Sequence, residues 1–209
     1  MMLPVEPLTL LSFIPAALAL NMTPGADMMF CLGQGLRSGP RAAMAANFGI
    51  AAGGLVQVLL AGLGLGALVA AHPWSFEAIR WAGVAYLLVL AAQCLRGGIA
   101  RPELVALARP LVVFRQAFLV NILNPKVILF ILAFLPQFVD PSRPMLPQFL
   151  TLGAVFCLGG LIVNGMVGTM AGGIGRRLAQ SATLARWLGR VSAGIFAGLA
   201  LRLAVMQRG

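Results

Sequence analysis

Six apolar stretches, separated by short polar connections, make up most of this sequence. Each is close to or above the roughly 20 residues that a helix needs to cross a bilayer. The pattern predicts six transmembrane helices over residues 8–36, 42–70, 79–95, 114–139, 145–174 and 191–206. Each group of three crosses the membrane an odd number of times, so the second group starts from the opposite side. We therefore expect an all-α integral membrane fold of two inverted three-helix repeats.

The composition points to the same class. Of the 209 residues, 60% are apolar and 10% are charged, whereas soluble domains carry about 25% charged residues. A soluble protein of this size could not bury so much apolar surface. We expect one transmembrane domain over residues 1–209, with repeat one at about 1–97, a cytoplasmic linker at about 97–113 and repeat two at about 114–209.

Two of the predicted helices are interrupted near their midpoints. Residues 21–27 read Asn-Met-Thr-Pro-Gly-Ala-Asp, and residues 121–126 read Asn-Ile-Leu-Asn-Pro-Lys. A proline removes one helical hydrogen bond and crowds the carbonyl one turn earlier. Asp27 and Lys126 are the only charges well inside the predicted spans. Paired breaks at corresponding positions of two repeats predict the binding site of a transporter, with helices one and four broken near the membrane midplane.

The residues at the breaks suit a small zwitterionic ligand. Helix N-termini created at mid-membrane bind carboxylates, Lys126 adds a positive charge, and Asp27 could meet an amino group. The candidate substrate-binding residues are Asn21, Thr23, Pro24, Gly25, Asn121, Asn124, Pro125 and Lys126. Three further polar residues inside the spans are secondary candidates for the lining: Asn47, Gln57 and Asn164.

Asp27 and Lys126 also form a candidate proton-coupling pair. The ammonium group would keep the carboxylate ionised, and a substrate carboxylate that competes for Lys126 would favour protonation of Asp27. The alternative is a structural ion pair with prolines that are tolerated as kinks. An ionisable residue inside the membrane favours the functional interpretation.

The net charge of +10 comes from fourteen arginines and one lysine against five acids. Nucleic-acid binding is disfavoured, since no compact basic face with interleaved aromatics is visible. The connections after the first, third and fifth spans hold two, four and four arginines, and the other two hold one each. Because basic loops stay in the cytoplasm, this pattern predicts both termini outside, although Arg202 and Arg208 point the other way.

Cysteine usage argues against a disulfide framework and against a clustered metal site, and we expect no cofactor. Cys31, Cys94 and Cys157 are far apart in the sequence and form no CxxC motif. Glycines four residues apart, such as Gly49 and Gly53, allow helices to approach closely in lipid. Such glycines pack helices within one bundle or between two copies of the chain. A homo-oligomer is therefore compatible with the sequence.

Several of these motifs resemble one known family. Residues 23–27 resemble the Thr-Pro-Gly-Pro-Asx signature of the LysE/RhtB amino-acid exporter superfamily (homoserine, threonine and lysine efflux type). Residues 49–53, 83–87 and 124–138 resemble, in the same order, its glycine-rich second helix, its Gly-Ala-Ala-Tyr-Leu segment and its Asn-Pro-Lys stretch. Ala26 departs from the pattern, because the family usually has a second proline there.

The resemblance implies a multi-pass protein of the bacterial inner membrane that exports amino acids with the proton gradient and is not an enzyme. Its partners would be an amino acid, protons and the lipid bilayer. The signature positions carried over are Pro24, Gly25, Asp27, Asn124, Pro125 and Lys126. No second acid stands near Asp27, which slightly favours neutral substrates such as homoserine, threonine or leucine.

Three other functions fit the sequence less well. An exporter of metal ions or other small solutes on the same scaffold is disfavoured, since metal sites need clustered carboxylate, imidazole or thiolate ligands. A membrane thiol-redox relay needs one cysteine per repeat at the centre, and the fourth span has none. A purely structural membrane protein would not need paired charges at the midplane.

Overall fold

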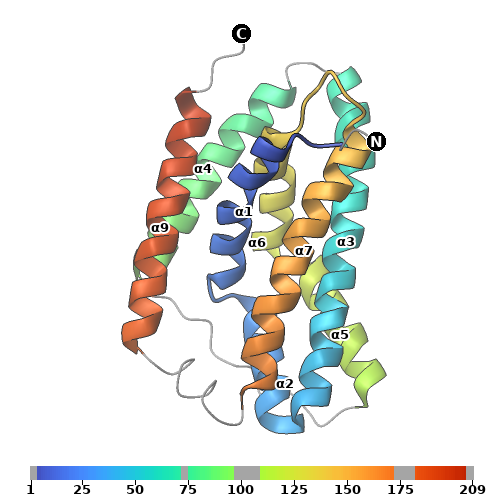
Figure 1. Ribbon diagram of the computed structural model, residues 1–209, viewed down its shortest axis with the longest axis vertical. Helices are drawn as coiled ribbons and strands as arrows, with labels where there is room; N and C mark the ends of the chain where they lie inside the picture. The colour runs from blue at the N-terminus through green and yellow to red at the C-terminus, as the bar shows by residue number, and fades with distance from the viewer. Residues whose placement is uncertain (1–3, 72–74, 97–108, 172–181, 206–209) are drawn as a thin grey trace.

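The chain forms a bundle of helices in a computed structural model that describes residues 4–71, 75–96, 109–171 and 182–205 (Figure 1). The described helices are α1 (Pro7–Met22), α2 (Ala26–Ser38), α3 (Pro40–Ala71), α4 (Ser75–Arg96), α5 (Pro110–Ile122), α6 (Pro125–Leu129), the π-helix η1 (Phe130–Phe134), the 3₁₀-helix η2 (Leu135–Phe138), α7 (Met145–Thr169) and α9 (Ala182–Val205). The predicted all-α class is confirmed in these ranges.

Both predicted helix breaks are present. The axes of α1 and α2 differ by 53°, and those of α5 and the segment Pro125–Phe138 differ by 49°. Thr23 and Gly25 have extended backbones around Pro24, and Asn124 is extended directly before Pro125. A residue before proline avoids the helical region, and proline suits the first turn of a new helix. The proline sequences therefore end one helix and begin the next.

Two helices are long and apolar enough to cross a membrane unaided, Pro40–Gly64 and Met145–Thr169. Each bent pair also qualifies if it counts as one span, so the described residues hold two to four candidate spans. Helix α4 contributes a shorter apolar stretch, Val84–Gln93. This is a multi-pass membrane architecture.

The helices reach further than the hydrophobic pattern predicted. Helix α5 begins at Pro110 rather than at residue 114, and α9 begins at Ala182 rather than at residue 191. The prediction that placed seven arginines in connections was therefore wrong, since helices contain Arg37, Arg41, Arg80, Arg96, Arg115, Arg186 and Arg190. The 32-residue α3 is about 48 Å long, more than the roughly 30 Å hydrocarbon core, so helix ends extend into the headgroup region. The predicted linker at 97–113 lies mostly outside the described residues.

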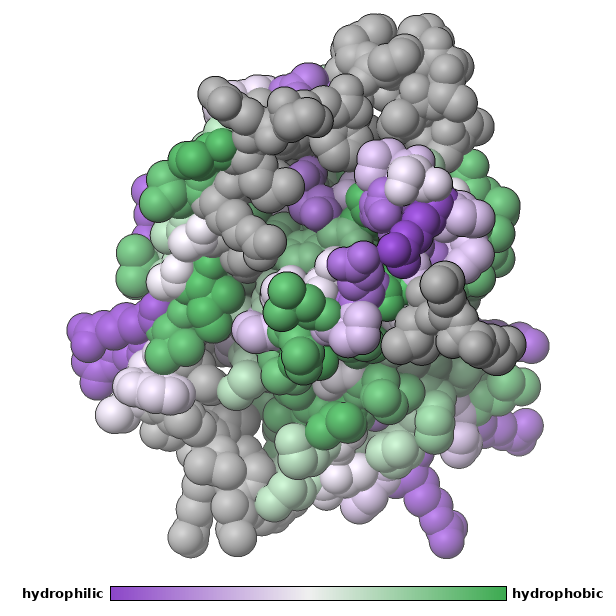
Figure 2. Space-filling view, turned by 45° about the horizontal axis from the view of Figure 1, so that its top comes forward, coloured by the Kyte–Doolittle hydropathy of each residue, from purple (hydrophilic) through white to green (hydrophobic). Residues whose placement is uncertain are grey.

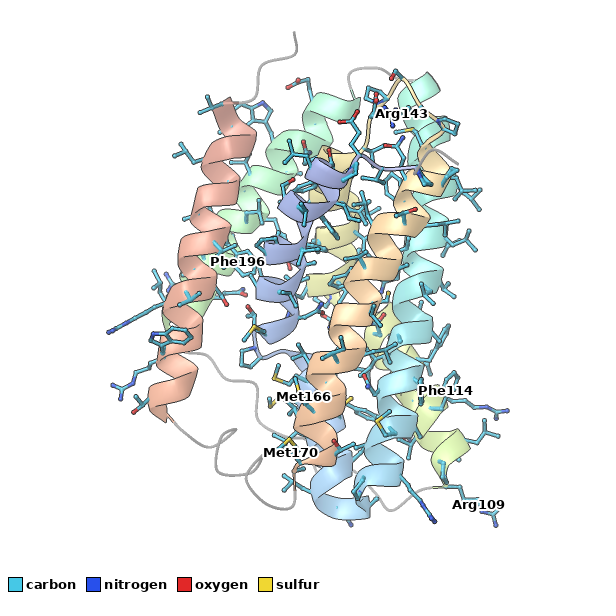
Figure 3. The ribbon with its side chains drawn as sticks, viewed as in Figure 1. Arg109, Phe114, Arg143, Met166, Met170 and Phe196 are labelled. Atoms are coloured by element: carbon cyan, nitrogen blue, oxygen red, sulfur yellow. The ribbon has the colours of Figure 1, made fainter. Side chains whose placement is uncertain are left out.

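The bundle has two sides with α1 and α6 between them (Figure 1). Helix α4 packs along α9 on one side, and α3 packs on α5 and α7 on the other (Figure 1). Helix α1 begins at the end of the bundle where the N-terminus lies and leads to α2 at the opposite end. Arg109, directly before α5, lies at that opposite end, and Arg143 lies at the N-terminal end (Figure 3). The two broken pairs therefore run in opposite directions.

Glycines bring the helices on the α3 side into close contact. A side chain at Gly49 would collide with the carbonyl oxygen of Phe114 on α5, and one at Gly35 with that of Gly168 on α7. The close-packing role predicted for Gly49 is confirmed. By contrast, a Cβ at Gly194 of α9 would meet no described atom within 4 Å.

Candidate functional site

The two helix breaks lie face to face in the middle of the bundle. The Asn121 side-chain amide donates a hydrogen bond to Asp27 Oδ2 at 2.9 Å. The Lys126 ammonium donates to the backbone oxygen of Thr23 at 2.6 Å. Each bond joins one break to the other across about a hundred residues of sequence. Each charged side chain thus contacts the opposite break.

Side chains satisfy the backbone groups that the second break frees. Asn124 Oδ1 accepts from the backbone N–H of Lys126 at 3.1 Å and caps α6. The Gln57 amide donates to the backbone oxygen of Asn121 at 2.7 Å. The Tyr86 hydroxyl donates to that of Lys126 at 3.2 Å. In lipid, where water cannot fill this role, such partners make a broken helix possible.

Gly25 makes room for the lysine at the first break. A Cβ at this position would lie 3.2 Å from Lys126 Nζ and 3.4 Å from its Cδ. Thr23 ends α1 with its backbone N–H on the carbonyls of Ala19 and Leu20, and its hydroxyl also donates to Ala19. The Thr-Pro-Gly sequence therefore ends one helix and leaves space for an ammonium group beside the start of the next.

A small cavity lies against the junction of the breaks. Its volume is about 20 Å³, enough for roughly one water molecule. It is lined by Asn21, Asp27, Ile50, Ala51, Gly54, Asn121, Phe156, Cys157, Gly160, Leu161 and Asn164. Four of the predicted site residues, on α1, α2, α5 and α7, therefore meet in one place. In this conformation the cavity is too small for an amino acid.

The junction is rich in polar atoms without a partner. Eight fully enclosed side-chain nitrogen or oxygen atoms in the described residues make no hydrogen bond. Five belong to predicted site residues: Asp27 Oδ1, Asn47 Oδ1, Gln57 Oε1, Asn121 Oδ1 and Asn124 Nδ2. Buried polar groups are normally paired, and unpaired ones call for an explanation such as a ligand or water. Three of them, on Asp27, Asn121 and Asn124, belong to the breaks themselves, which supports a binding role for the junction.

The secondary candidates have different surroundings. Asn164 lines the cavity. Asn47 donates to the backbone oxygen of Leu161 at 2.8 Å and joins α3 to α7. Gln57 supports the second break and lines a separate apolar groove between α3 and the segment Ile128–Leu132. Neither Asn47 nor Gln57 is among the residues that line the cavity.

Sequence reasoning missed the small side chains in the cavity wall. Gly54 of α3 faces Cys157 of α7, because a Cβ at Gly54 would lie 3.0 Å from the cysteine sulfur. A Cβ at Gly160 would lie 3.2 Å from Asn21 Oδ1. The two Gly-Gly pairs at 53–54 and 159–160 could have indicated this wall from the sequence. Successive residues point about 100° apart around the helix axis, so each pair points its glycines in two different directions.

An aromatic cluster separates this cavity from the N-terminal end. Ring centroids 5.0–6.1 Å apart connect Phe156, which lines the cavity, through Phe130 and Phe13 to Phe138. Beyond Phe138 lies an outer pocket of about 230 Å³ with Glu6, Asp140, Arg143 and Gln148 in its wall. Hydrophilic residues gather on this end of the molecule (Figure 2). The conformation is closed between the outer pocket and the junction.

Arg143 forms two ion pairs in the wall of the outer pocket. It pairs with Glu6 at 3.1 Å and with Asp140 at 3.2 Å. All three groups are well exposed, so they stabilise the fold little. No group of three His, Cys, Asp or Glu side chains in the described ranges could hold a metal ion.

Comparison with known proteins identifies the family. The family described as "LysE type translocator" matches residues 18–207. The chain belongs to the LysE family. A LysE protein is a transporter, not an enzyme, so the predicted resemblance is confirmed.

Relatives of this LysE protein have about 30% identity to it. An uncharacterized membrane protein of Vibrio cholerae is 32% identical over 202 residues, covering 94% of this chain and 97% of the relative. A homoserine/homoserine lactone efflux protein of Salmonella typhimurium is 32% identical over 162 residues (77% and 79%). A leucine efflux protein of Salmonella choleraesuis is 28% identical over 210 residues (94% of each). No solved structure matches the chain.

Proposed function

We propose that this LysE protein exports a small neutral amino acid, of the homoserine, threonine or leucine type, from the bacterial cytoplasm by exchange with protons. The observation that carries the proposal is the junction of the two breaks. It holds one carboxylate and one ammonium group, each contacting the opposite break, beside a cavity with unpaired polar atoms. A zwitterion has the complementary charges.

The names of two relatives support this substrate class. Homoserine, homoserine lactone and leucine all carry a primary amine, and none has a charged side chain. The lactone has no free carboxylate, so the amine is the group that all three share. In this chain, Asp27 is the acid at the cavity, where the Asn121 amide donates to its Oδ2.

The proposed binding mode uses both breaks. The substrate amine lies at Asp27, and its carboxylate lies near Lys126 and the first turn of α2, whose N-terminal N–H groups favour an anion. Gly25 leaves the space for this approach. A carboxylate that draws Lys126 away from Thr23 changes the electrostatics of both breaks together. Proton uptake by Asp27 on one side of the membrane and release on the other would then couple the two movements.

The proposed topology is six crossings in two inverted repeats of the inner membrane, with both termini outside. The opposite directions of the two broken pairs support it (Figure 1). The start of α1 and the end of α9 also lie at the same end of the bundle. Arginines at the end of α2 and at the starts of α3 and α9 mark the opposite end, which the positive-inside rule assigns to the cytoplasm. Transport would require closure on the cytoplasmic side around the bound substrate, followed by opening of the aromatic cluster toward the outside.

Uptake into inside-out membrane vesicles tests the proposal. A panel of labelled amino acids is supplied with and without an imposed proton gradient. Wild-type vesicles should accumulate one or a few neutral amino acids, and Lys126→Met should not. Arg109→Met, which removes a positive charge from an exposed position at the start of α5, is the matched control and should behave as wild type. Failure of the folded wild type to move any amino acid would refute the substrate class.

A further inference from the structure

Asn164 is a buried amide with no hydrogen-bond partner among the described residues. It lies on α7, is 5% exposed and lines the cavity at the junction. In the described part of the chain, no hydrogen bond reaches its side chain, whereas the other polar side chains of the lining are bonded: Asn21 to Phe156, and Asn121 to Asp27. Neither break contains this residue. A buried amide that faces a cavity and has no protein partner is available to hydrogen-bond a ligand.

The unpaired groups in the cavity differ in what they can bind. Asp27 Oδ1 and Asn121 Oδ1 are acceptors and suit an ammonium group. The Asn164 amide offers both an NH₂ donor and a C=O acceptor. A hydroxyl group can use both, because it donates one hydrogen bond and accepts another. An aliphatic group uses neither and leaves the amide desolvated, which is the costlier outcome.

The wall between these groups is built from small residues. Ala51 and Gly54 line it from α3, and Gly160 lines it from α7. A Cβ at Gly160 would lie 3.2 Å from Asn21 Oδ1 and 4.0 Å from Asn164 Nδ2. The glycine therefore separates two amides that a larger residue would crowd.

We propose that Asn164 makes the site selective for small amino acids whose side chain carries a hydroxyl group over aliphatic amino acids of the same size. The inference rests on the proposed function, since it concerns the side chain of the exported amino acid. It makes Asn164 a specificity-determining residue, separate from the groups assigned to the amine and the carboxylate. Sites that hydrogen-bond a substrate hydroxyl reject the analogue that lacks it more strongly than apolar pockets reject an extra hydroxyl.

Threonine and valine provide the test, because they have nearly the same shape and differ by one hydroxyl. The ratio of their initial uptake rates is measured in inside-out vesicles at equal subsaturating concentrations. Wild type should prefer threonine by about tenfold, the equivalent of one net hydrogen bond. Asn164→Leu should bring the ratio close to one by losing threonine uptake while it keeps or gains valine uptake. Asn164→Ala should lower the ratio in the same way if the larger leucine prevents folding.

The matched control is Thr169→Val, on the same helix. Its hydroxyl donates to the backbone oxygen of Gly165 within α7 at 2.7 Å, and it should keep the wild-type ratio. An unchanged ratio in both Asn164 variants would overturn the inference and leave the exporter proposal intact. Equal loss of both substrates would also overturn it, since Asn164 would then act on a group common to all amino acids. If wild type moves neither threonine, valine nor any other amino acid, the proposed function fails and this inference fails with it.

Discussion

Replacing Gly53 by alanine should disturb the junction without touching either charged residue. Gly53 lies on α3 beneath Asn121, and a Cβ there would be 2.9 Å from Asn121 Oδ1, 3.0 Å from its Cβ and 3.0 Å from the backbone oxygen of Phe118. Rotation of the asparagine relieves only the first contact, because the other two atoms are fixed by the backbone of α5. Helices α3 and α5 must therefore separate by a few tenths of an ångström.

Gly64→Ala is the matched control on the same helix. A Cβ at Gly64 would meet no described atom within 4 Å. The higher helix propensity of alanine is common to both variants and cancels in the comparison. Overpacking typically costs about 1–3 kcal/mol. For a chain of this size each kcal/mol shifts the melting temperature by about 2–4 °C, so Gly53→Ala should melt about 2–12 °C below Gly64→Ala.

Two assays separate stability from function. Melting in detergent gives the difference between the variants, and uptake into inside-out vesicles, corrected for folded protein, gives the effect on transport. The shift of Asn121 lengthens its bond to Asp27, so uptake should also fall in Gly53→Ala and not in Gly64→Ala. Equal melting temperatures and equal uptake in the two variants would refute the close approach of α3 and α5 at the junction.

Three further substitutions test other parts of the account. Asp27→Asn should abolish gradient-driven uptake while substrate exchange across vesicles without a gradient persists; unaltered gradient-driven uptake would exclude Asp27 as the proton carrier. Glu6→Gln removes one exposed partner of Arg143 and should change the free energy of unfolding by less than about 1 kcal/mol, measured as a melting temperature close to wild type; a large drop would mean that this outer pair stabilises the fold. Gly35→Ala places a methyl group against the backbone carbonyl of Gly168 and should lower the fraction of monodisperse protein in size-exclusion chromatography; a wild-type yield would contradict the packing of α2 on α7.

The breaks were predictable from sequence because their cause is local. Proline and the residue before it restrict the backbone wherever they stand, so Pro24 and Pro125 ended helices as expected. The choice of partners was not predictable. Whether Lys126 contacts Thr23, and whether Asp27 contacts Asn121, depends on how α1, α2 and α5 pack, and that packing depends on glycines distributed over α3 and α7.

The ends of the helices were the weakest part of the prediction. Hydropathy marks where a helix leaves the hydrocarbon core and not where its hydrogen bonds end. Helix α9 therefore continues through Arg186 and Arg190 toward Ala182, since long arginine side chains can reach the headgroups from a helical turn. The aromatic cluster of Phe13, Phe130 and Phe138 could also not be predicted from the sequence, because its members lie on different helices that meet only in the folded bundle.

Binding of labelled threonine to the purified protein tests the central claim most directly, because it does not depend on the proton gradient. Saturable binding to wild type and to Thr169→Val, with loss of binding in Lys126→Met and in Asp27→Ala, is the predicted result. It would show that the two broken helices together form the substrate site. If Lys126→Met and Asp27→Ala fold and bind threonine as tightly as wild type, the substrate site lies elsewhere and the junction of the breaks is structural.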